Sequence, residues 1–158
     1  MDIAFLKTPL GIAEIKGDEQ GLVAVSVLNE ETREISREIP ASLNNAVQQL
    51  QEYFAGERKE FQLKLNPQGT PFQKKVWQSL LEIPFGKTIS YLEHSRKLGD
   101  EKAIRAVASA NGKNPLWIVV PCHRVIGSDG TLTGYAGGLW RKKWLLEHES
   151  GFNQGSLF

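Results

Sequence analysis

Residues 90–111 read "SYLEHSRKLGDEKAIRAVASAN", and their pattern sets the architecture expected for the second half of the chain. Ser90 and Glu93 have the spacing of a capping box, in which two side chains cap the first turn of a helix. Gly99 is a typical helix end, and Asp100 is placed to cap a second helix directly afterwards. Two short helices joined through a glycine turn are typical of a helix-turn-helix, which we therefore predict here.

The second of these helices has an unusual composition. Residues 103–110 read "AIRAVASA" and carry one large cation, Arg105, among small side chains. An alanine-rich face usually means tight packing against a neighbouring helix, but it would also let a helix enter a groove of DNA. A helix that reads base edges would offer Asn, Gln or several Arg side chains. This helix offers almost none, so the alternative to packing is minor-groove docking with little sequence preference and with Arg105 inserted.

Further helices are expected on both sides of this pair. Thr70, Pro71 and Gln73 supply a cap, a first-turn proline and a capping-box partner for a helix that ends at about residue 82. A last helix, over about residues 138–149, follows a glycine-rich loop. The apolar side chains that this last helix is expected to bury are Leu139, Trp144 and Leu145.

The first third of the chain has the pattern of strands. Apolar and polar residues alternate, with turn residues between the runs, in "DIAFLKT" (2–8), "GIAEIKG" (11–17) and "GLVAVSVL" (21–28). A helix that stops at Gly56 should follow, because apolar residues recur at helical spacing at Leu43, Val47, Leu50 and Phe54. The segment "FQLKL" (61–65) is a candidate for one more strand.

These patterns predict an α+β fold in two domains. A small strand-rich N-terminal domain, residues 1–66, would act as structural support, and "NPQGTP" (66–71) would link it to the next domain. The C-terminal domain, residues 70–150, would be mostly helical and contain the helix-turn-helix. Residues 151–158 have no helical period and are expected to form a flexible tail.

Composition narrows the functional classes. A hydrophobic content of 41% and a charged content of 23% are those of a soluble globular chain. No run approaches about 18 consecutive apolar residues, and no basic lead precedes an apolar stretch, so we expect a cytoplasmic protein without a membrane partner. Residues 1–70 carry 7 Lys or Arg against 11 Asp or Glu, whereas residues 71–158 carry 12 against 7. This asymmetry indicates either a solvated basic face or a polyanionic partner for the C-terminal half.

The sequence has a single cysteine, Cys122, in "PCHRVIG" (121–127). A lone cysteine can form no internal disulfide and no thiolate zinc site, and its commonest role is inert packing. Pro121 constrains the backbone before it, which suits a defined turn. His123 and Arg124 add positive charge beside it, and positive charge lowers the pKa of a thiol.

A carboxylate near the C-terminus could complete a reactive site. Glu149, in "EHE" (147–149), could orient His123 and give a Cys–His–Glu arrangement. Adjacent Cys and His side chains do not easily hydrogen-bond directly, so a water would bridge them. Spacing alone does not show that these residues meet.

The C-terminal motifs resemble one known family. "NGKNP" (111–115), "PCHRVIG" and "GYAGG…WLLEHE" are similar to motifs of the O6-alkylguanine-DNA alkyltransferases, also called methylated-DNA–protein-cysteine methyltransferases. The resemblance runs from about Thr70 to Glu149, and the N-terminal third is similar only as a strand-rich domain of the right size.

The resemblance implies a suicide DNA-repair protein. Such a protein binds the minor groove of double-stranded DNA, flips the damaged nucleotide and transfers an alkyl group irreversibly from O6 of guanine, or O4 of thymine, to its cysteine. One molecule acts once, as a monomer, with no cofactor and no metal. The N-terminal zinc site of some relatives lacks its cysteines here.

The resemblance also assigns roles to individual residues. Cys122 would accept the alkyl group, His123 would be its base through a water, and Glu149 would hold His123. Asn114 would tie the active-site turn together, and Tyr91 would donate a proton to the leaving guanine and contact DNA. The base pocket would be lined by Val125, Tyr135, Ala136 and Gly137. The other DNA contacts would be Arg105 as the intercalating finger, Ala106, Ser109 and Ser128.

Two features of this chain are less usual. Ala136 stands where many relatives have serine, which removes one hydrogen bond to guanine, and Gly137 leaves the pocket mouth open to alkyl groups larger than methyl. The tail "QGSLF" (154–158) resembles a short peptide that binds the bacterial sliding clamp, with glycine at the second place instead of leucine. Clamp binding is the additional partnership that this tail implies.

Two other classes remain as alternatives. A lesion-binding protein without repair activity would use the helix-turn-helix and leave Cys122 as packing, although such relatives lack this cysteine. A cysteine hydrolase or redox enzyme would need an oxyanion hole or a second, resolving cysteine. The sequence has no second cysteine, and His94 and His148 have no evident site around them.

Overall fold

The computed structural model describes residues 1–29, 33–130, 132, 135 and 137–151. Ala136 and the clamp-like segment 154–158 are therefore outside the described residues. The chain forms two compact units: one contains residues 1–68 together with 115–119, and the other contains residues 69–114 and the chain from 120 onward. Each unit is described by itself below.

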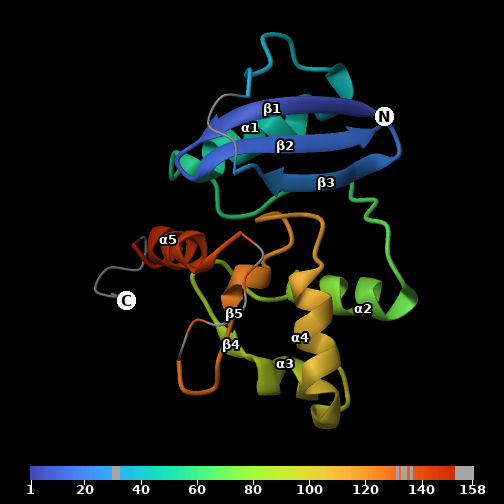
Figure 1. The fold of residues 1–158 in the computed structure, drawn as a ribbon, viewed down its shortest axis with the longest axis vertical. Helices are drawn as coiled ribbons and strands as arrows, with labels where there is room; N and C mark the ends of the chain where they lie inside the picture. Colours follow the sequence, from blue (N-terminus) through green and yellow to red (C-terminus); the bar gives the residue numbers. More distant parts are fainter. Residues whose placement is uncertain (30–32, 131, 133–134, 136, 152–158) are drawn as a thin grey trace. The chain divides into compact units, whose positions relative to one another are not determined.

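The first unit contains a three-stranded antiparallel sheet (Figure 1). Its strands follow one another in space as in sequence: β1 (Asp2–Thr8), β2 (Gly11–Asp18) and β3 (Gly21–Val27). The three strands predicted from the alternation of apolar and polar residues are confirmed. Residues at every second position of β1, Ala4 and Leu6, are buried, as expected for a sheet with one covered face.

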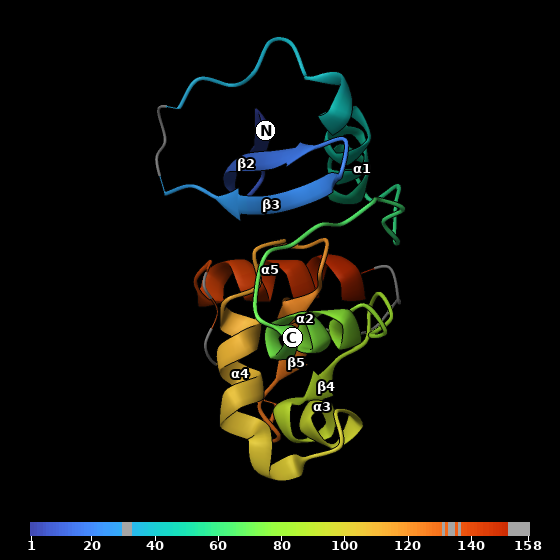
Figure 2. The same ribbon diagram turned by 90° about the vertical axis from the view of Figure 1, so that its right-hand side faces the viewer.

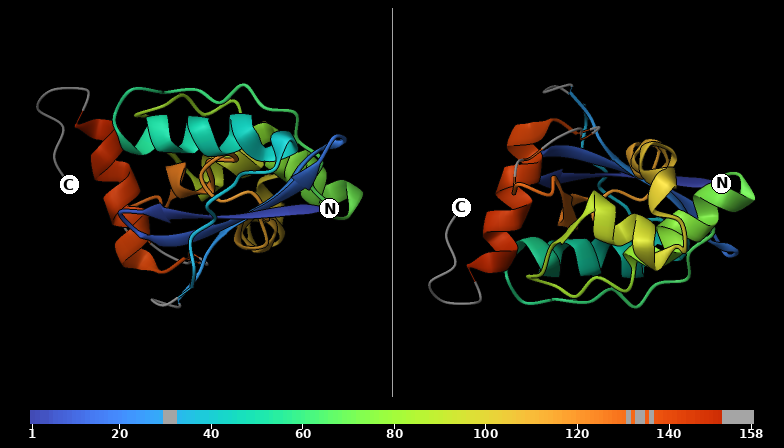
Figure 3. Two further views of the ribbon diagram at one scale, coloured as in Figure 1. Left: turned by 90° about the horizontal axis from the view of Figure 1, so that it is seen from above. Right: turned by 90° about the horizontal axis from the view of Figure 1, so that it is seen from below.

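One helix covers a face of this sheet. A short 3-10 turn, η1 (Ala41–Leu43), leads into α1 (Asn44–Phe54), which runs roughly along the strands (Figures 2 and 3). The expected apolar face is the one that packs: Leu43, Val47 and Leu50 are almost fully buried. Burying these side chains between helix and sheet is the main source of stability of such a small unit.

The candidate strand at 61–65 is wrong, because only an isolated bridge forms there, between Leu22 and Leu65. The N–H of Leu22 donates to the carbonyl of Lys64, and the carbonyl of Leu22 accepts from the N–H of Asn66, at 2.8 Å each. Both backbone groups of Leu22 are then occupied. The rest of the segment is held by a side chain instead: the amide of Gln49 bonds both the N–H and the C=O of Gln62.

A second segment of the first unit comes from far along the chain. Residues 115–119 pair with β3, since Val25 donates to the carbonyl of Pro115 at 2.9 Å and accepts from Trp117 at 3.0 Å. The next residue, Ile118, has φ of 71°, a conformation that strains a β-branched side chain. This segment, which immediately precedes the turn containing Cys122, was not predicted from the sequence.

The second unit is mostly helical, as predicted. Its elements in chain order are α2 (Pro71–Leu80), β4 (Ile89–Ser90), α3 (Tyr91–Lys97), η2 (Glu101–Ala103), α4 (Ile104–Gly112), η3 (Cys122–Arg124), β5 (Val125–Ile126) and α5 (Leu139–Ser150). Both predicted capping boxes are present, at the starts of α2 and α3. Gly99 ends the turn after α3 with φ of 92°, which glycine adopts without strain, and Asp100 caps η2, the 3-10 turn that leads into α4. The short strands β4 and β5 pair in parallel and bring Ile89 beside Val125.

The inward face of α5 differs from the expectation. Leu145 is buried and Trp144 is half-buried, but Leu139 is 48% exposed. The buried residues of α5 instead include three charged ones, Arg141, Lys142 and Glu149. Lys142 and Glu149 lie seven residues apart and therefore on the same side of the helix. The prediction for Leu139 was wrong because it assigned the interior to apolar side chains alone.

A buried polar cluster joins three helices of this unit. The side chain of His94 in α3 is fully buried, with Nε2 2.6 Å from Ser79 Oγ in α2 and Nδ1 3.5 Å from Asn111 Nδ2 in α4. The Ser79 hydroxyl donates to the carbonyl of Val76 at 2.8 Å, so it accepts from His94 Nε2–H. His94 is therefore neutral, and burial, with a smaller effect of Lys97, lowers its pKa to about 4.

This histidine should make the protein sensitive to mild acid. The unfolded chain takes up a proton at His94 near pH 6.5, whereas the folded protein does so only near pH 4. The stability contributed by neutral His94 is therefore lost as pH falls through this window, by at most about 1.4 kcal/mol per pH unit. Urea unfolding at several pH values should show a shallower pH slope for His94→Leu than for the wild type. Equal slopes would contradict the assignment, since His123 is present in both proteins.

Candidate active site

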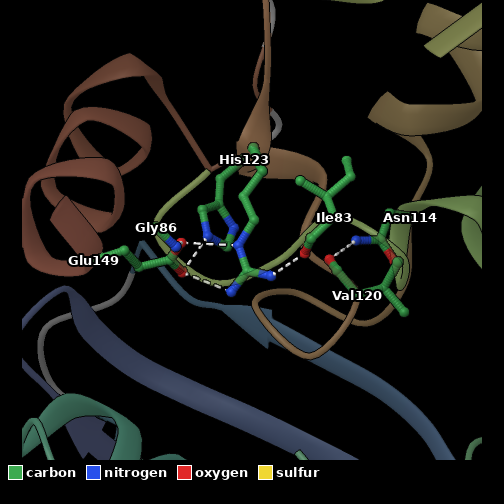
Figure 4. A network of polar contacts seen from close by, with 7 residues as sticks. Ile83, Gly86, Asn114, Val120, His123 and Glu149 are labelled. Atoms are coloured by element: carbon green, nitrogen blue, oxygen red, sulfur yellow. Dashed lines mark hydrogen bonds and ion pairs between the residues drawn. The ribbon is translucent and has the colours of Figure 1, made fainter. Parts of the chain in front are cut away.

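The turn that contains Cys122 is held by an asparagine. Asn114 Nδ2 donates to the carbonyl of Val120 at 2.8 Å (Figure 4). The same nitrogen lies 3.3 Å from the sulfur of Cys122. The backbone N–H of Cys122 bonds the same carbonyl at 2.8 Å. Cys122 as a whole is half-buried, and these contacts fix the position of its thiol. The structure thus brings together Asn114 and Cys122, which the sequence separates by seven residues.

His123 and Glu149 meet in the interior of the second unit. Nε2 of His123 lies 2.7 Å from Oε2 of Glu149, and both side chains are almost completely buried (Figure 4). An ionised carboxylate can only accept hydrogen bonds, so Nε2 carries the proton and donates it. Nδ1 is then the ring atom with a free lone pair. It is buried and has no hydrogen-bond partner among the described residues.

Arg124 locks the carboxylate in place. Its Nε donates to Oε1 of Glu149 at 2.8 Å and its Nη2 donates to Oε2 at 3.0 Å, which is a bidentate pair. Its third donor, Nη1, bonds the carbonyl of Ile83 at 2.7 Å. The backbone N–H of Gly86 adds a longer contact of 3.4 Å to Oε1 (Figure 4). Arg124 therefore acts on Glu149, whereas the sequence analysis considered it as a charge beside the thiol.

The ionisation states follow from these contacts. Burial alone would raise the pKa of Glu149, but His123 and Arg124 outweigh it, and the pKa of Glu149 lies well below its ordinary value. Burial lowers the pKa of His123, although Glu149 attracts a proton to it, so His123 is neutral and its Nδ1 can accept a proton. Burial raises the pKa of the Cys122 thiol, and the hydrogen bond from Asn114 and the charge of Lys142 oppose this rise.

The rings of two tyrosines lie close to a buried lysine, Lys142. Tyr91 is the first residue of α3, and the ammonium group of Lys142 lies 5.7 Å from its ring centre and 5.9 Å from that of Tyr135. A side chain at Gly137 would press on the ring of Tyr135, because a Cβ there would lie 3.1 Å from it. Lys142 is one of the basic residues of the second half of the sequence, and its spacing from Glu149 on one helix was the available signal of its buried position.

Four of the five residues expected to contact DNA are exposed, and the fifth, Tyr91, is half-buried. Arg105, Ala106 and Ser109 are all exposed on α4, while Val107 and Ala110 on its other side are buried. Ser128 is exposed after β5, and Val125 within β5 is buried. The small residues of this helix therefore divide between two sides: Ala106 and Ser109 are exposed, whereas Ala110 packs inside the unit, where its carbonyl accepts a hydrogen bond from Trp77 Nε1 at 2.8 Å.

The described part of the chain contains neither a cluster of metal ligands nor a membrane-spanning helix. Within residues 1–29, 33–130, 132, 135 and 137–151, no three His, Cys, Asp or Glu side chains are grouped as metal ligands. In the same ranges no helix is sufficiently long and apolar to span a bilayer.

Comparisons with known proteins identify the family. The model of the 6-O-methylguanine DNA methyltransferase DNA-binding domain matches residues 71–151, and that of the ribonuclease-like domain of the same proteins matches residues 1–67. The chain belongs to the O6-alkylguanine-DNA alkyltransferase family. The resemblance seen in the sequence is confirmed. It extends to the N-terminal domain, which the sequence alone showed only to be strand-rich and of the right size.

Individual relatives cover nearly the whole chain. The methylated-DNA–protein-cysteine methyltransferase of Methanosarcina acetivorans is 46% identical over 156 residues, which are 94% of this chain and 98% of that protein. The crystal structure of the O6-methylguanine methyltransferase of Mycobacterium tuberculosis superposes with a TM-score of 0.85 at 44% identity, covering 98% of this chain and 95% of the other. A structure of the M. tuberculosis protein OGT in complex with DNA has a TM-score of 0.85 at 45% identity, covering 94% and 93%.

Proposed function

We propose that this protein repairs DNA by moving an alkyl group from O6 of guanine to the sulfur of Cys122. The observation that carries the proposal is the half-buried thiol held by Asn114, followed directly by a neutral His123 that Glu149 orients. Family membership supports the same chemistry, since the relatives carry the name of this activity. The M. tuberculosis structure in complex with DNA supports DNA as the partner.

The transfer is a displacement at an sp3 carbon. Nδ1 of His123 takes the proton of Cys122 through a bridging water, and the resulting thiolate attacks the alkyl carbon. The sulfur–carbon bond forms while the bond from that carbon to O6 breaks, and the electron pair of the broken bond passes to the guanine. A thiolate suits this step because it is the softest nucleophile that side chains offer.

The leaving base needs a proton, and Tyr91 is the donor in this proposal. Guanine departs poorly as an anion, so the phenol of Tyr91 supplies a proton to the ring as the carbon–oxygen bond breaks. Thymine carrying an alkyl group at O4 presents the same kind of bond and is the second expected substrate. The product on Cys122 is a thioether, which none of these groups can cleave, so each molecule reacts once.

Access to the base requires extrusion from the duplex. The target oxygen lies on the major-groove edge, whereas the small-residue face of α4 suits the minor groove. Flipping the nucleotide out of the stack reconciles the two, with Arg105 filling the gap and Val125, Tyr135 and Gly137 lining the pocket. Extrusion costs a few kcal/mol, and less for a weakened alkylguanine pair, which favours damaged bases.

The test is a mass spectrum of the intact protein and its peptides after mixing with duplex DNA that contains one O6-methylguanine. We expect a gain of one methyl group, on the peptide that contains Cys122, in an amount that never exceeds one per protein molecule. The matched control is Cys122→Ala, which should bind the duplex and gain nothing. A wild-type protein that binds the lesion but gains no methyl would replace the proposal with the non-repairing, lesion-binding alternative.

A further inference from the structure

Lys142 is a fully buried lysine that the proposed mechanism does not use. An ammonium group is expensive to remove from water unless charges or polar groups compensate for it. The aromatic rings of Tyr91 and Tyr135 supply part of this compensation, because both lie within about 6 Å of its Nζ. Such a residue marks a place where positive charge is needed inside the unit.

Its position on α5 relates it to the reacting pair. Lys142 and Glu149 are seven residues apart, so both project from the same side of the helix, and α5 packs against η3, which contains Cys122 and His123. Glu149 contacts His123 directly. One helix thus brings a buried anion to the histidine and a buried cation to the neighbourhood of the thiol.

We propose that Lys142 is a positioning residue that stabilises the thiolate of Cys122, as the complement of Glu149, which stabilises the protonated His123. Moving a proton from Cys122 to His123 creates a negative sulfur and a positive ring. Each new charge then finds a fixed opposite charge already in place, so little rearrangement is needed. The proposal rests on the proposed function only for its biological role, since the thiolate can be tested without DNA.

The pKa shifts of the surrounding groups agree with these separate roles of Lys142 and Glu149. Burial lowers the pKa of Lys142 to about 8, and the nearby Cys122 opposes that fall. Lys142 in turn lowers the pKa of both Cys122 and His123, so it favours the thiolate and repels a proton from the ring. Tyr91 and Tyr135 face it from other segments, and Glu149 and Arg124 balance each other near His123.

The single thiol makes a direct test possible, because iodoacetamide will label Cys122 alone. We would measure the rate of labelling from neutral to alkaline pH for the wild type, Lys142→Met and Lys142→Arg. The control is Lys143→Met, which removes the adjacent exposed cation. We expect Lys142→Met to lower the rate at neutral pH about tenfold and to approach the wild type at alkaline pH, because only the thiol pKa has changed. Lys142→Arg should stay within a few-fold of the wild type.

Two outcomes would overturn the proposal. One is a wild-type pH profile in Lys142→Met; the other is a loss of rate by the same factor at every pH, which would mean a packing defect. A second measurement needs no variant and so does not depend on the variant folding. Nitrogen NMR of the lysine side chains should show that labelling Cys122 lowers the pKa of Lys142 below about 8, because the thiolate is gone. An unchanged pKa would also contradict the proposal.

These results are independent of the repair assay. A protein that gains no methyl from DNA yet shows the lysine-dependent thiolate would disprove the proposed function and keep this inference. A protein that repairs DNA but whose thiol ionisation does not depend on Lys142 would support the proposed function and contradict this inference.

Discussion

Replacing Glu149 with glutamine is expected to lower the free energy of unfolding by about 3–5 kcal/mol and to abolish alkyl transfer. The carboxylate accepts three short hydrogen bonds from His123 and Arg124 and is almost completely buried. A neutral amide would leave the guanidinium of Arg124 buried without its counter-charge. It would also remove the anion that holds His123 with Nδ1 free, so the thiol would lose its base.

The measurements are chemical denaturation for stability and methyl gain by mass spectrometry for transfer. Glu147→Gln is a matched control on the same helix, since Glu147 is largely exposed, and it should leave both quantities nearly unchanged. A double variant, Arg124→Met with Glu149→Leu, separates the two roles. It should recover much of the lost stability because no charge is left unpaired, yet remain inactive. Transfer at the wild-type rate in either Glu149 variant would refute the assignment.

Replacing Arg105 with alanine is expected to slow repair of duplex DNA by about a hundredfold. In the proposed complex this exposed side chain of α4 fills the gap left by the extruded nucleotide. Extrusion costs a few kcal/mol, and losing about 2–3 kcal/mol of compensation corresponds to that factor in rate. The reactive group around Cys122 is not altered, so transfer from a lesion in single-stranded DNA should change much less.

Single-turnover rates on matched duplex and single-stranded oligonucleotides test this expectation. Lys102→Ala removes a nearby exposed cation at the start of the same helical segment and serves as the control for lost phosphate attraction. Its effect should be small and should vary with salt concentration, whereas the effect of Arg105→Ala on duplex repair should persist at high salt. Equal losses on the two kinds of DNA would rule out a gap-filling role.

Much of the local structure could be predicted because its causes lie within a few residues. The capping boxes that begin α2 and α3 are contacts between residues three apart, so the sequence displays them directly. The alternation in the first strands reports a sheet with one covered face. The candidate strand at 61–65 failed for a non-local reason: its partner, Leu22, pairs at one point only, and the side chain of Gln49 holds the rest.

The motif around Cys122 predicted the candidate nucleophile, but the arrangement of its neighbours depends on the tertiary fold. His123 and Glu149 are 26 residues apart and meet only because α5 packs against η3. The same packing turns Arg124 toward Glu149 rather than the thiol. It also buries Lys142, whereas the apolar pattern of the sequence predicted that Leu139 would be buried.

The sequence by itself determined the first three strands, the main helices, the division into a strand-rich and a helical part, and the family, because propensity, capping and motif spacing are local properties of the chain. Only the tertiary structure decided which charges are buried and which nitrogen of His123 is left to accept a proton. These depend on desolvation and on contacts between distant segments, so they exist only after the helices have packed.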